Sequence, residues 1–323
     1  MQIVVVDCML ESLYRIAGIL CGIVFNRELG LSDIGDFDGM ACAALFKMKY
    51  PRGIVVFASP RDIKNSVLIR WTAWEFVGDL PCPGKVKIRA DHHETNTPCA
   101  EREFYDPSAP AAAVMAIKAL GLTGNLKAEK IVSCAVETDT ANIISEEARI
   151  LNAATKGARY SEKVKLAELL AEKGTEAVKD EFVMKLASRY FDVERRTEQL
   201  AERIPISDQV IVVFEKNVGI SYRYLSILLN RRGANFTLIL VPRGLFGVRA
   251  YFGARPNSPY NSAFLARALG GGGHQYAAGA YVRAFPRRQA LLKILGLVKS
   301  ELRLKKLNYL FVNKDGELED RSL

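Results

Sequence analysis

Short strand-like runs alternate with helical stretches through the first half of this 323-residue chain. The runs are rich in β-branched or aromatic residues and end in a polar residue; they cover residues 53–59, 73–79, 85–91 and 130–139. Helical stretches lie at 40–50 and 108–121, the second with Ser108 as its N-cap and Gly121 as its stop. Strands that alternate with helices predict an α/β fold with a parallel sheet covered on both faces.

The pattern changes at about residue 145, where long charged helices begin and continue to about residue 205. We interpret them as solvated helices that join two domains, because charge runs usually mark exposed faces. Strands resume at 208–215, 236–242 and 246–254. A chain of this length exceeds what one hydrophobic core usually serves. We therefore predict a first domain over residues 1–190, the end of a linker helix over 191–207 and a second domain over 208–323.

The N-terminal 25 residues are apolar, but Asp7, Glu11 and Arg15 interrupt them. The uninterrupted part is shorter than the roughly 20 residues that a membrane span needs. We predict a buried strand followed by a helix in this segment, and no convincing strand immediately before Ser32. The cysteines have no zinc-ligand spacing, so free thiols in a reduced cytosol are the simplest account of them. All six lie in the first half: Cys8, Cys21, Cys42, Cys82, Cys99 and Cys134. A cytoplasmic protein without a membrane segment is expected.

The balance of charge is basic, with 45 lysines and arginines against 36 aspartates and glutamates and a net charge of +9. An excess of positive charge favours polyanionic partners such as nucleic acids or nucleotides. The basic residues are spread along the chain, so a generally solvated surface explains most of them.

Acidic residues and histidines follow several of the predicted elements. Ligands bind at the carboxyl ends of the strands in open α/β sheets, so these residues are expected to converge there. Carboxylates crowded at one edge repel one another unless cations lie among them. Oxygen ligands with imidazole suit manganese, magnesium or iron, and manganese is the natural choice for a mixed set. The residues are Asp36 and Asp38 before Gly39, then Asp79, Asp91, His92, His93 and Asp139.

The third histidine of the chain, His274, follows four glycines, residues 270–273. Glycines let the main chain approach a ligand closely and point successive N–H groups at an anion. A flexible hinge is the alternative reading of such a run. The attached histidine and the acidic cluster earlier in the chain favour a phosphate-binding loop.

Together these motifs resemble the DHH phosphoesterase superfamily, in the branch that carries the DHH-associated C-terminal domain. The resemblance rests on order and spacing from about residue 33 to residue 285. It implies a parallel-sheet catalytic domain, joined by a helical linker to a smaller α/β domain with a mixed sheet. The branch includes RecJ-like exonucleases, nano-RNases, phosphatases of 3'-phosphoadenosine 5'-phosphate and cyclic dinucleotide phosphodiesterases. The matching residues are 36–39, 79, 91–93, 138–140, 271–274 and 277–279.

The resemblance also implies roles for individual residues. Asp79 would bridge two Mn²⁺ ions, for which Mg²⁺ or Co²⁺ can substitute, with Asp36 on one ion. Asp38, His92 and Asp139 would bind the other ion. The predicted catalytic residues are His93, as a phosphate contact, and Asp91, which would orient a histidine. Substrate phosphate would be bound by Arg255 and by the loop of Gly271, Gly272, Gly273 and His274.

The sequence departs from the family at one metal ligand. A histidine normally stands just before the first aspartate pair, where the candidate positions here hold Ser32 and Ile34. The first metal site is therefore expected to be weaker, or completed by Asp33 or by water.

Three hypotheses follow from these patterns. The first is a metal-dependent phosphoesterase that acts on short RNA or DNA oligonucleotides or on small nucleotides. The second is a catalytically weakened relative that binds nucleic acid or works in replication. The third, hydrolysis of pyrophosphate or polyphosphate, is disfavoured because those relatives lack the glycine-histidine loop. A processive exonuclease on long strands is also disfavoured, since the chain has no room for an additional OB-fold. A homodimer is left open.

Overall fold

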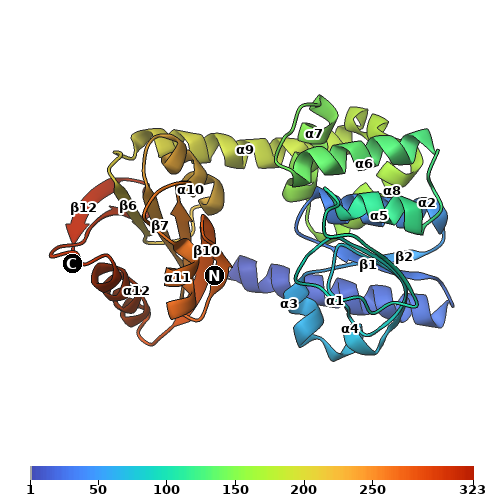
Figure 1. Cartoon of the computed structure of the whole chain (residues 1–323), viewed down its shortest axis with the longest axis horizontal. Helices are drawn as coiled ribbons and strands as arrows, with labels where there is room; N and C mark the ends of the chain where they lie inside the picture. Colours follow the sequence, from blue (N-terminus) through green and yellow to red (C-terminus); the bar gives the residue numbers. More distant parts are fainter. Residues whose placement is uncertain (1) are drawn as a thin grey trace. The chain divides into compact units, whose positions relative to one another are not determined.

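The computed structural model describes residues 2–323, with side chains from residue 10 onward. It divides into two compact units, Met1–Phe191 and Asp192–Leu323. The helix α9, Glu181–Arg203, passes through the boundary between them. Figure 1 shows the elements of both units.

The first unit is built on a five-stranded sheet in the order β2-β1-β3-β4-β5, and every strand pairing in it is parallel. The predicted parallel α/β architecture of this part of the chain is thus confirmed. Its strands are β1 Leu29–Asp33, β2 Ile54–Ala58, β3 Ala73–Gly78, β4 Lys85–Asp91 and β5 Arg102–Tyr105.

Helices cover both faces of this sheet (Figure 1). One face packs against α1 Gln2–Val24, α3 Pro60–Asn65 and α4 Val67–Trp71. A larger apolar cluster on the other face involves α2 Phe37–Lys49, α5 Ala112–Ala119, α6 Leu126–Asp139, α7 Glu146–Gly157 and α8 Tyr160–Lys173. A short 3-10 helix, Gly174–Lys179, precedes α9.

The N-terminal segment differs from its prediction. It forms one helix, α1, instead of a strand followed by a helix. A helix pairs its backbone groups internally, whereas a strand there would need a neighbour to pair with. The prediction of no strand before Ser32 was also wrong, because β1 pairs with both β2 and β3. Strand β1 has only five residues, and one of them is a glycine, so its sequence carries little strand signal. Glycine is required at position 30 because a Cβ atom there would lie 2.7 Å from the Phe46 ring.

Residues 130–139, predicted as a strand, belong to helix α6. The buried residues Ala128, Ile131, Cys134 and Ala135 recur at helical spacing, and Asn125 caps the helix. Ser108 is not the N-cap of α5, which begins at Ala112.

Cys82 and Cys99 form a disulfide, so the prediction of free thiols was wrong for this pair. Cys21, Cys42 and Cys134 are free, and Cys8 lies outside the residues whose side chains are described. Among the described residues, no helix combines the length and the apolar character that crossing a membrane requires.

The second unit contains a seven-stranded mixed sheet in the order β12-β11-β6-β7-β8-β10-β9, which confirms the predicted mixed sheet. Helix α10, Tyr222–Arg231, packs on one face, and α11 Ser262–Ala268 and α12 Arg287–Glu301 pack on the other. The strands are β6 Gln209–Phe214, β7 Phe236–Arg243, β8 Gly247–Ala254, β9 Gly272–His274, β10 Ala277–Arg283, β11 Asn308–Val312 and β12 Leu318–Ser322.

Candidate metal centre

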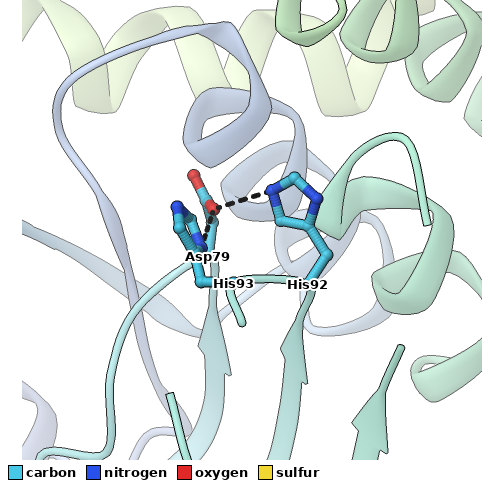
Figure 2. A group of neighbouring side chains, drawn as sticks. All are labelled: Asp79, His92 and His93. Atoms are coloured by element: carbon cyan, nitrogen blue, oxygen red, sulfur yellow. Dashed lines mark ion pairs between the residues drawn. The ribbon is translucent and has the colours of Figure 1, made fainter. Parts of the chain in front are cut away.

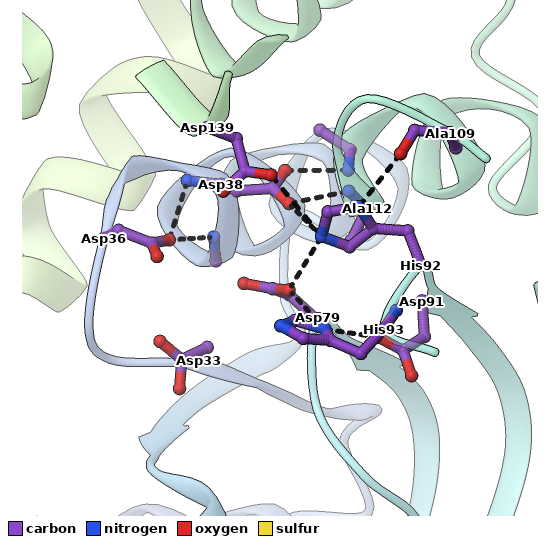
Figure 3. A network of polar contacts seen from close by, with 12 residues as sticks. Asp33, Asp36, Asp38, Asp79, Asp91, His92, His93, Ala109, Ala112 and Asp139 are labelled. Carbon is purple, nitrogen blue, oxygen red and sulfur yellow. Dashed lines mark hydrogen bonds and ion pairs between the residues drawn. The ribbon is translucent and has the colours of Figure 1, made fainter. Parts of the chain in front are cut away.

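Carboxylates and imidazoles from five elements meet at the carboxyl edge of the first unit's sheet (Figure 3). They fall into three overlapping groups, and within each group one ligand atom per residue lies within 4.8 Å of the others. His92 is shared by two groups, and so is Asp79. The groups are Asp33, Asp36 and Asp79; Asp79, His92 and His93; and Asp38, His92 and Asp139.

Asp36 is the N-cap of α2. Its Oδ1 accepts hydrogen bonds from the backbone N–H groups of Asp38, at 3.1 Å, and Gly39, at 3.3 Å. A Cβ atom on Gly39 would lie 2.3 Å from the carbonyl oxygen of Asp33, so only glycine fits. The Asp-x-Asp-Gly sequence therefore encodes a tight turn into a helix as well as two carboxylates.

Asp38 is buried and caps a second helix from 74 residues away. Its carboxylate accepts hydrogen bonds from the backbone N–H groups of Ala112, at 2.6 Å, and Ala113, at 2.8 Å. These are orphan donors of the first turn of α5, where Ala111 offers no side-chain cap. Burial nevertheless raises the pKa of Asp38 to about 7, and the two hydrogen bonds oppose that rise.

Asp79 lies directly after β3 with a left-handed backbone, φ 58°. Its side chain is buried, and Oδ1 has no hydrogen-bond partner. This oxygen lies between the two histidines (Figure 2), 4.0 Å from His92 Nε2 and 3.5 Å from His93 Nδ1. Burial, followed by the charges of Asp38 and Asp36, raises its pKa well above the ordinary value. A buried, unpaired carboxylate oxygen is costly without a cation.

His92 is oriented by a carbonyl. Its Nδ1 lies 3.0 Å from the oxygen of Ala109, and since a carbonyl can only accept, Nδ1 carries the proton. The lone pair of Nε2 then faces Asp139 at 3.5 Å, Asp38 at 3.8 Å and Asp79 at 4.0 Å. A second ring nitrogen held by a carbonyl is the usual arrangement of metal-binding histidines. The donor set therefore fits a divalent cation.

Asp91 orients the other histidine. Its fully buried carboxylate accepts from His93 Nδ1 at 2.9 Å, from Asn96 Nδ2 at 2.7 Å and from Arg89 Nη1 at 3.1 Å. Burial alone would raise the pKa of Asp91, but the bonds from His93 and Asn96 and the charge of Arg89 lower it overall. The hydrogen bond to Asp91 raises the pKa of His93. Half of the His93 ring stays exposed.

Between Ser32 and Ile34, where the sequence departs from the pattern that it resembles, the structure offers a carboxylate. Asp33, at the end of β1, groups with Asp36 and Asp79, whereas Ser32 is buried and donates to the carbonyl of Gly39 at 2.7 Å. Burial raises the pKa of Asp33 to about 6.

Lys163 is a buried cation near this cluster that sequence reasoning missed. Its Nζ donates to the carbonyl oxygens of Ile34 and Thr155, each at 2.8 Å. Burial lowers its pKa to about 8. It supports the 34–36 turn from α8, 129 residues further along the chain. No local pattern in the sequence signals such a contact.

Apart from His93, the predicted substrate-binding residues lie in the second unit. Arg255 directly follows β8 and His274 ends β9, at the same end of the sheet, and both are exposed. Cβ atoms on Gly271 and Gly273 would lie 2.2 Å from the Gly279 oxygen and 2.5 Å from Ala278 Cα, so close strand packing requires both glycines. Gly272 has open space around its Cα.

No family model matches the chain, and no curated protein matches it in sequence. Solved structures do match. A pGpG-specific phosphodiesterase, PggH, from Vibrio cholerae is 18% identical with a TM-score of 0.63, over 84% of this chain and 99% of that one. Exonuclease RecJ bound to manganese is 12% identical with a TM-score of 0.60, over 86% and 90%. An exopolyphosphatase-related protein from Bacteroides fragilis is 13% identical with a TM-score of 0.51, over 89% and 98%.

Proposed function

We propose that this chain, which has the two-domain fold of the DHH phosphoesterases, is a metal-dependent hydrolase of phosphodiester bonds. The observation that carries the proposal is the buried Oδ1 of Asp79, which lies without a hydrogen-bond partner between His92 and His93. A buried carboxylate oxygen without a partner is costly, and a cation bound between the two histidines would satisfy it.

Two divalent ions, with Mn²⁺ as the first choice, would share Asp79. Asp33 and Asp36 would hold one ion, and the other would be held by the residues that meet around His92. These are Asp38, His92 and Asp139. When bound, the ions would lower the pKa of a water molecule and neutralise charge on the substrate phosphate.

His93 would bind the phosphate that is cleaved. Its Nδ1 is engaged by Asp91, so the free edge of the half-exposed ring is available to a substrate. Asp91 also favours the protonated ring, which can donate to a phosphate oxygen. Asp91 thus acts on the substrate through His93, and Arg89 and Asn96 hold Asp91 in place.

The substrates we propose are short RNA or DNA oligonucleotides or small nucleotides. The likeness to a pGpG-specific phosphodiesterase and to an exonuclease supports a nucleotide substrate. Arg255 would bind phosphate through its planar guanidinium fork. Residues 271–274 include the edge strand β9 and would bind phosphate through backbone N–H groups and His274.

The test is release of mononucleotides from diribonucleotides and short RNA by the purified protein with Mn²⁺, Mg²⁺ or Co²⁺. We expect activity with Mn²⁺ that Asp79→Asn lowers by at least about a thousand-fold, since it removes charge shared by both ions. Asp320→Asn, on exposed β12, is the matched control and should keep full activity. No release with any of the three metals would contradict the proposal.

A second candidate is a weakened relative that binds nucleic acid without cleaving it. One observation favours it: the group of Asp33, Asp36 and Asp79 contains no imidazole. Calorimetric titration with Mn²⁺ separates the two candidates. Two sites per chain support the hydrolase, and one site or none supports the binding protein.

A further inference from the structure

The solvent side of helix α1 carries no charge. The described side chains of this helix, residues 10–24, include two charged ones, Glu11 and Arg15, which pair with each other at 3.4 Å. Arg15 is buried. A surface helix normally has charged or polar residues opposite the core. Here the exposed residues are apolar apart from Ser12 and Cys21. We define the outer face of α1 by Leu10, Leu13, Tyr14, Ile16, Ala17, Leu20, Ile23 and Val24.

Contacts on the other side of α1 prevent the helix from turning its outer face inward. Arg15 Nε donates to the carbonyl of Phe57 at 2.9 Å, and Ile19 is 1% exposed. Gly22 faces the sheet, where a Cβ atom would lie 2.3 Å from Leu29 Cδ2. A larger residue turned to that position would clash, because the interior is closely packed. The outer face therefore stays in solvent in a single chain.

The outer face is large for a protein that exists as a single chain. Its seven large side chains are 42–73% exposed. Helix α4 lies beside α1 (Figure 1), because Ile16 and Leu68 line the same cavity of about 180 Å³, and Trp71 of α4 is 80% exposed. At roughly 150–200 Å² for a whole side chain, the outer face and Trp71 offer on the order of 800 Å² of apolar surface. Each partner in a standard protein interface buries about this area, whereas the largest apolar patch on a typical monomer covers about 300–600 Å².

Apolar residues on the outer face repeat at the spacing of paired helices. They follow one another at alternating intervals of three and four residues, at Leu10, Leu13, Ala17, Leu20 and Val24. This spacing forms a stripe along the helix that fits a stripe on a second helix. Ala17 is the small residue in the middle of the stripe. Two helices can therefore approach closely there, while the leucines on either side interlock.

We propose that this chain forms a two-fold symmetric dimer through the outer face of α1. In a two-fold dimer the same patch of each copy meets its equivalent, so the patch must be compatible with itself. A face without charge meets this condition, because two copies bring no like charges together. The inference goes beyond the proposed hydrolysis. No member of the three ligand groups lies in α1, so each copy would keep its own metal centre.

An anionic membrane is the competing partner for an exposed apolar helix. Helices that lie in a membrane surface are rich in lysine and arginine on their polar side, where these side chains meet lipid headgroups. Among the described residues of α1 the basic side chain is Arg15, which is buried and contacts Asp62 at 3.1 Å. In addition, lipid imposes no spacing on apolar residues, whereas the outer face has a regular one. A second copy of the chain therefore fits this face better.

Sedimentation velocity and light scattering of the full-length protein in EDTA test the proposal. We expect a mass near twice the 35.8 kDa of one chain over the micromolar range. Leu13→Glu with Leu20→Glu should raise the dissociation constant of the dimer by at least about a thousand-fold, since each substitution occurs twice in a two-fold interface. Leu126→Glu with Ile144→Glu is the matched control. These side chains are 74% and 81% exposed elsewhere in the first unit, and the dimer should persist.

Disulfide crosslinking tests where the two copies meet without adding charge. In a background of Cys8→Ser and Cys21→Ser, Ala17→Cys should give a covalent dimer on oxidation, because a disulfide needs two Cα atoms only about 4.4–6.8 Å apart. Ser133→Cys, at an exposed position of α6, should not. Circular dichroism and Mn²⁺ calorimetry of the glutamate variant should match those of the unaltered protein, so that only association has changed.

Four results would overturn the inference. They are a monomer throughout the micromolar range, a dimer that the two glutamates in α1 leave intact, crosslinking at position 17 no better than at position 133, and a monomer that binds phosphatidylserine vesicles unless α1 carries those glutamates. The last result would make a membrane the partner of this face. A dimer without Mn²⁺-dependent hydrolysis would contradict only the proposed hydrolase, and a monomer that hydrolyses dinucleotides would contradict only this inference.

Discussion

The candidate metal centre of the first unit and residues 216–300 of the second differ in the sign of the charge that they gather. The first gathers carboxylates in a buried place, where burial raises the pKa values of Asp33, Asp38 and Asp79. The second leaves most of its arginines in solvent, in a stretch free of acidic residues. The buried site needs a cation before it can face an anion, whereas the exposed arginines need none.

The difference extends to how each region is held in place. Four carboxylates of the candidate metal centre accept hydrogen bonds that fix them, as Asp38 does from the first turn of α5; the other three are Asp33, Asp36 and Asp91. Among the described residues, the ion pairs of the second unit lie outside residues 216–300, at Arg195–Asp192 and Arg321–Glu319. The first region should therefore respond to single substitutions and to pH, and the second to salt.

The largest expected effect is separation of metal binding from substrate binding by one substitution in each region. His92→Ala removes a donor shared by two ligand groups, so hydrolysis should fall by at least about a thousand-fold. Mn²⁺ calorimetry should show one site fewer. Arg255→Gln should keep both Mn²⁺ sites and instead raise KM for a dinucleotide by about ten-fold or more, since a hydrogen bond to a charged group contributes about 1.5–3 kcal/mol. If Arg255→Gln also removed a Mn²⁺ site, the two regions could not be independent.

The sequence predicted the fold class and the residues that the structure brings together at the metal centre, because these depend on local patterns. Alternating strands and helices predict the parallel sheet. The Asp-x-Asp-Gly motif begins the predicted helix α2, and the Asp-His-His motif ends the predicted strand β4, so the sequence pattern also indicates where these motifs lie. The sequence favours a strand that ends at Asp139, because a short apolar run has no unambiguous period. It reaches the site from the end of α6 instead.

Contacts between distant segments escaped prediction for a physical reason. The cap that Asp38 provides for α5 spans 74 residues, and the contact of Lys163 with Ile34 spans 129. Neither contact produces a periodic pattern in the sequence, because each depends on how separate elements pack. The absence of acidic residues from 216 to 300 can be seen in the sequence alone, but the net charge of the whole chain does not reveal it.

The second prediction concerns pH and the metal-free first unit. The pKa of Asp33 is raised to about 6 and that of Asp38 to about 7, so the folded state keeps protons that the unfolded chain releases. The stability that these protons provide is present at low pH and is lost as pH rises from about 4 to 7. Asp33 alone should account for a loss on the order of 3 kcal/mol in the free energy of unfolding.

Urea unfolding in EDTA, followed by circular dichroism at several pH values, checks this prediction. Saturating Mn²⁺ should flatten the dependence, because a cation replaces the protons, and Asp33→Asn should reduce it without metal. A free energy of unfolding that does not change with pH in EDTA would show that these carboxylates are less buried than the structure indicates.

The third prediction uses a covalent difference between the units, since all cysteines precede residue 135. The Cys82–Cys99 disulfide joins the loop after Asp79 to the loop after His93 across 17 residues. Closing a loop of this length contributes about 3 kcal/mol to the free energy of unfolding. Cys82→Ser with Cys99→Ser should lose about that much and bind Mn²⁺ more weakly. Cys21→Ser, at an exposed free thiol, is the control.

The smallest effect expected is that of salt, and it separates the two regions most directly. Raising salt from about 50 to 200 mM should raise KM for a dinucleotide by about three-fold, because one phosphate contact, that of Arg255, contributes about 0.7 to the slope of log affinity against log salt. Mn²⁺ affinity should change far less, since buried charges are screened less than exposed ones. Kinetic assays and calorimetry on one protein preparation provide the comparison. Equal salt dependence would mean that the carboxylates are as open to solvent as the arginines, which would contradict the buried position of Asp38 and Asp79.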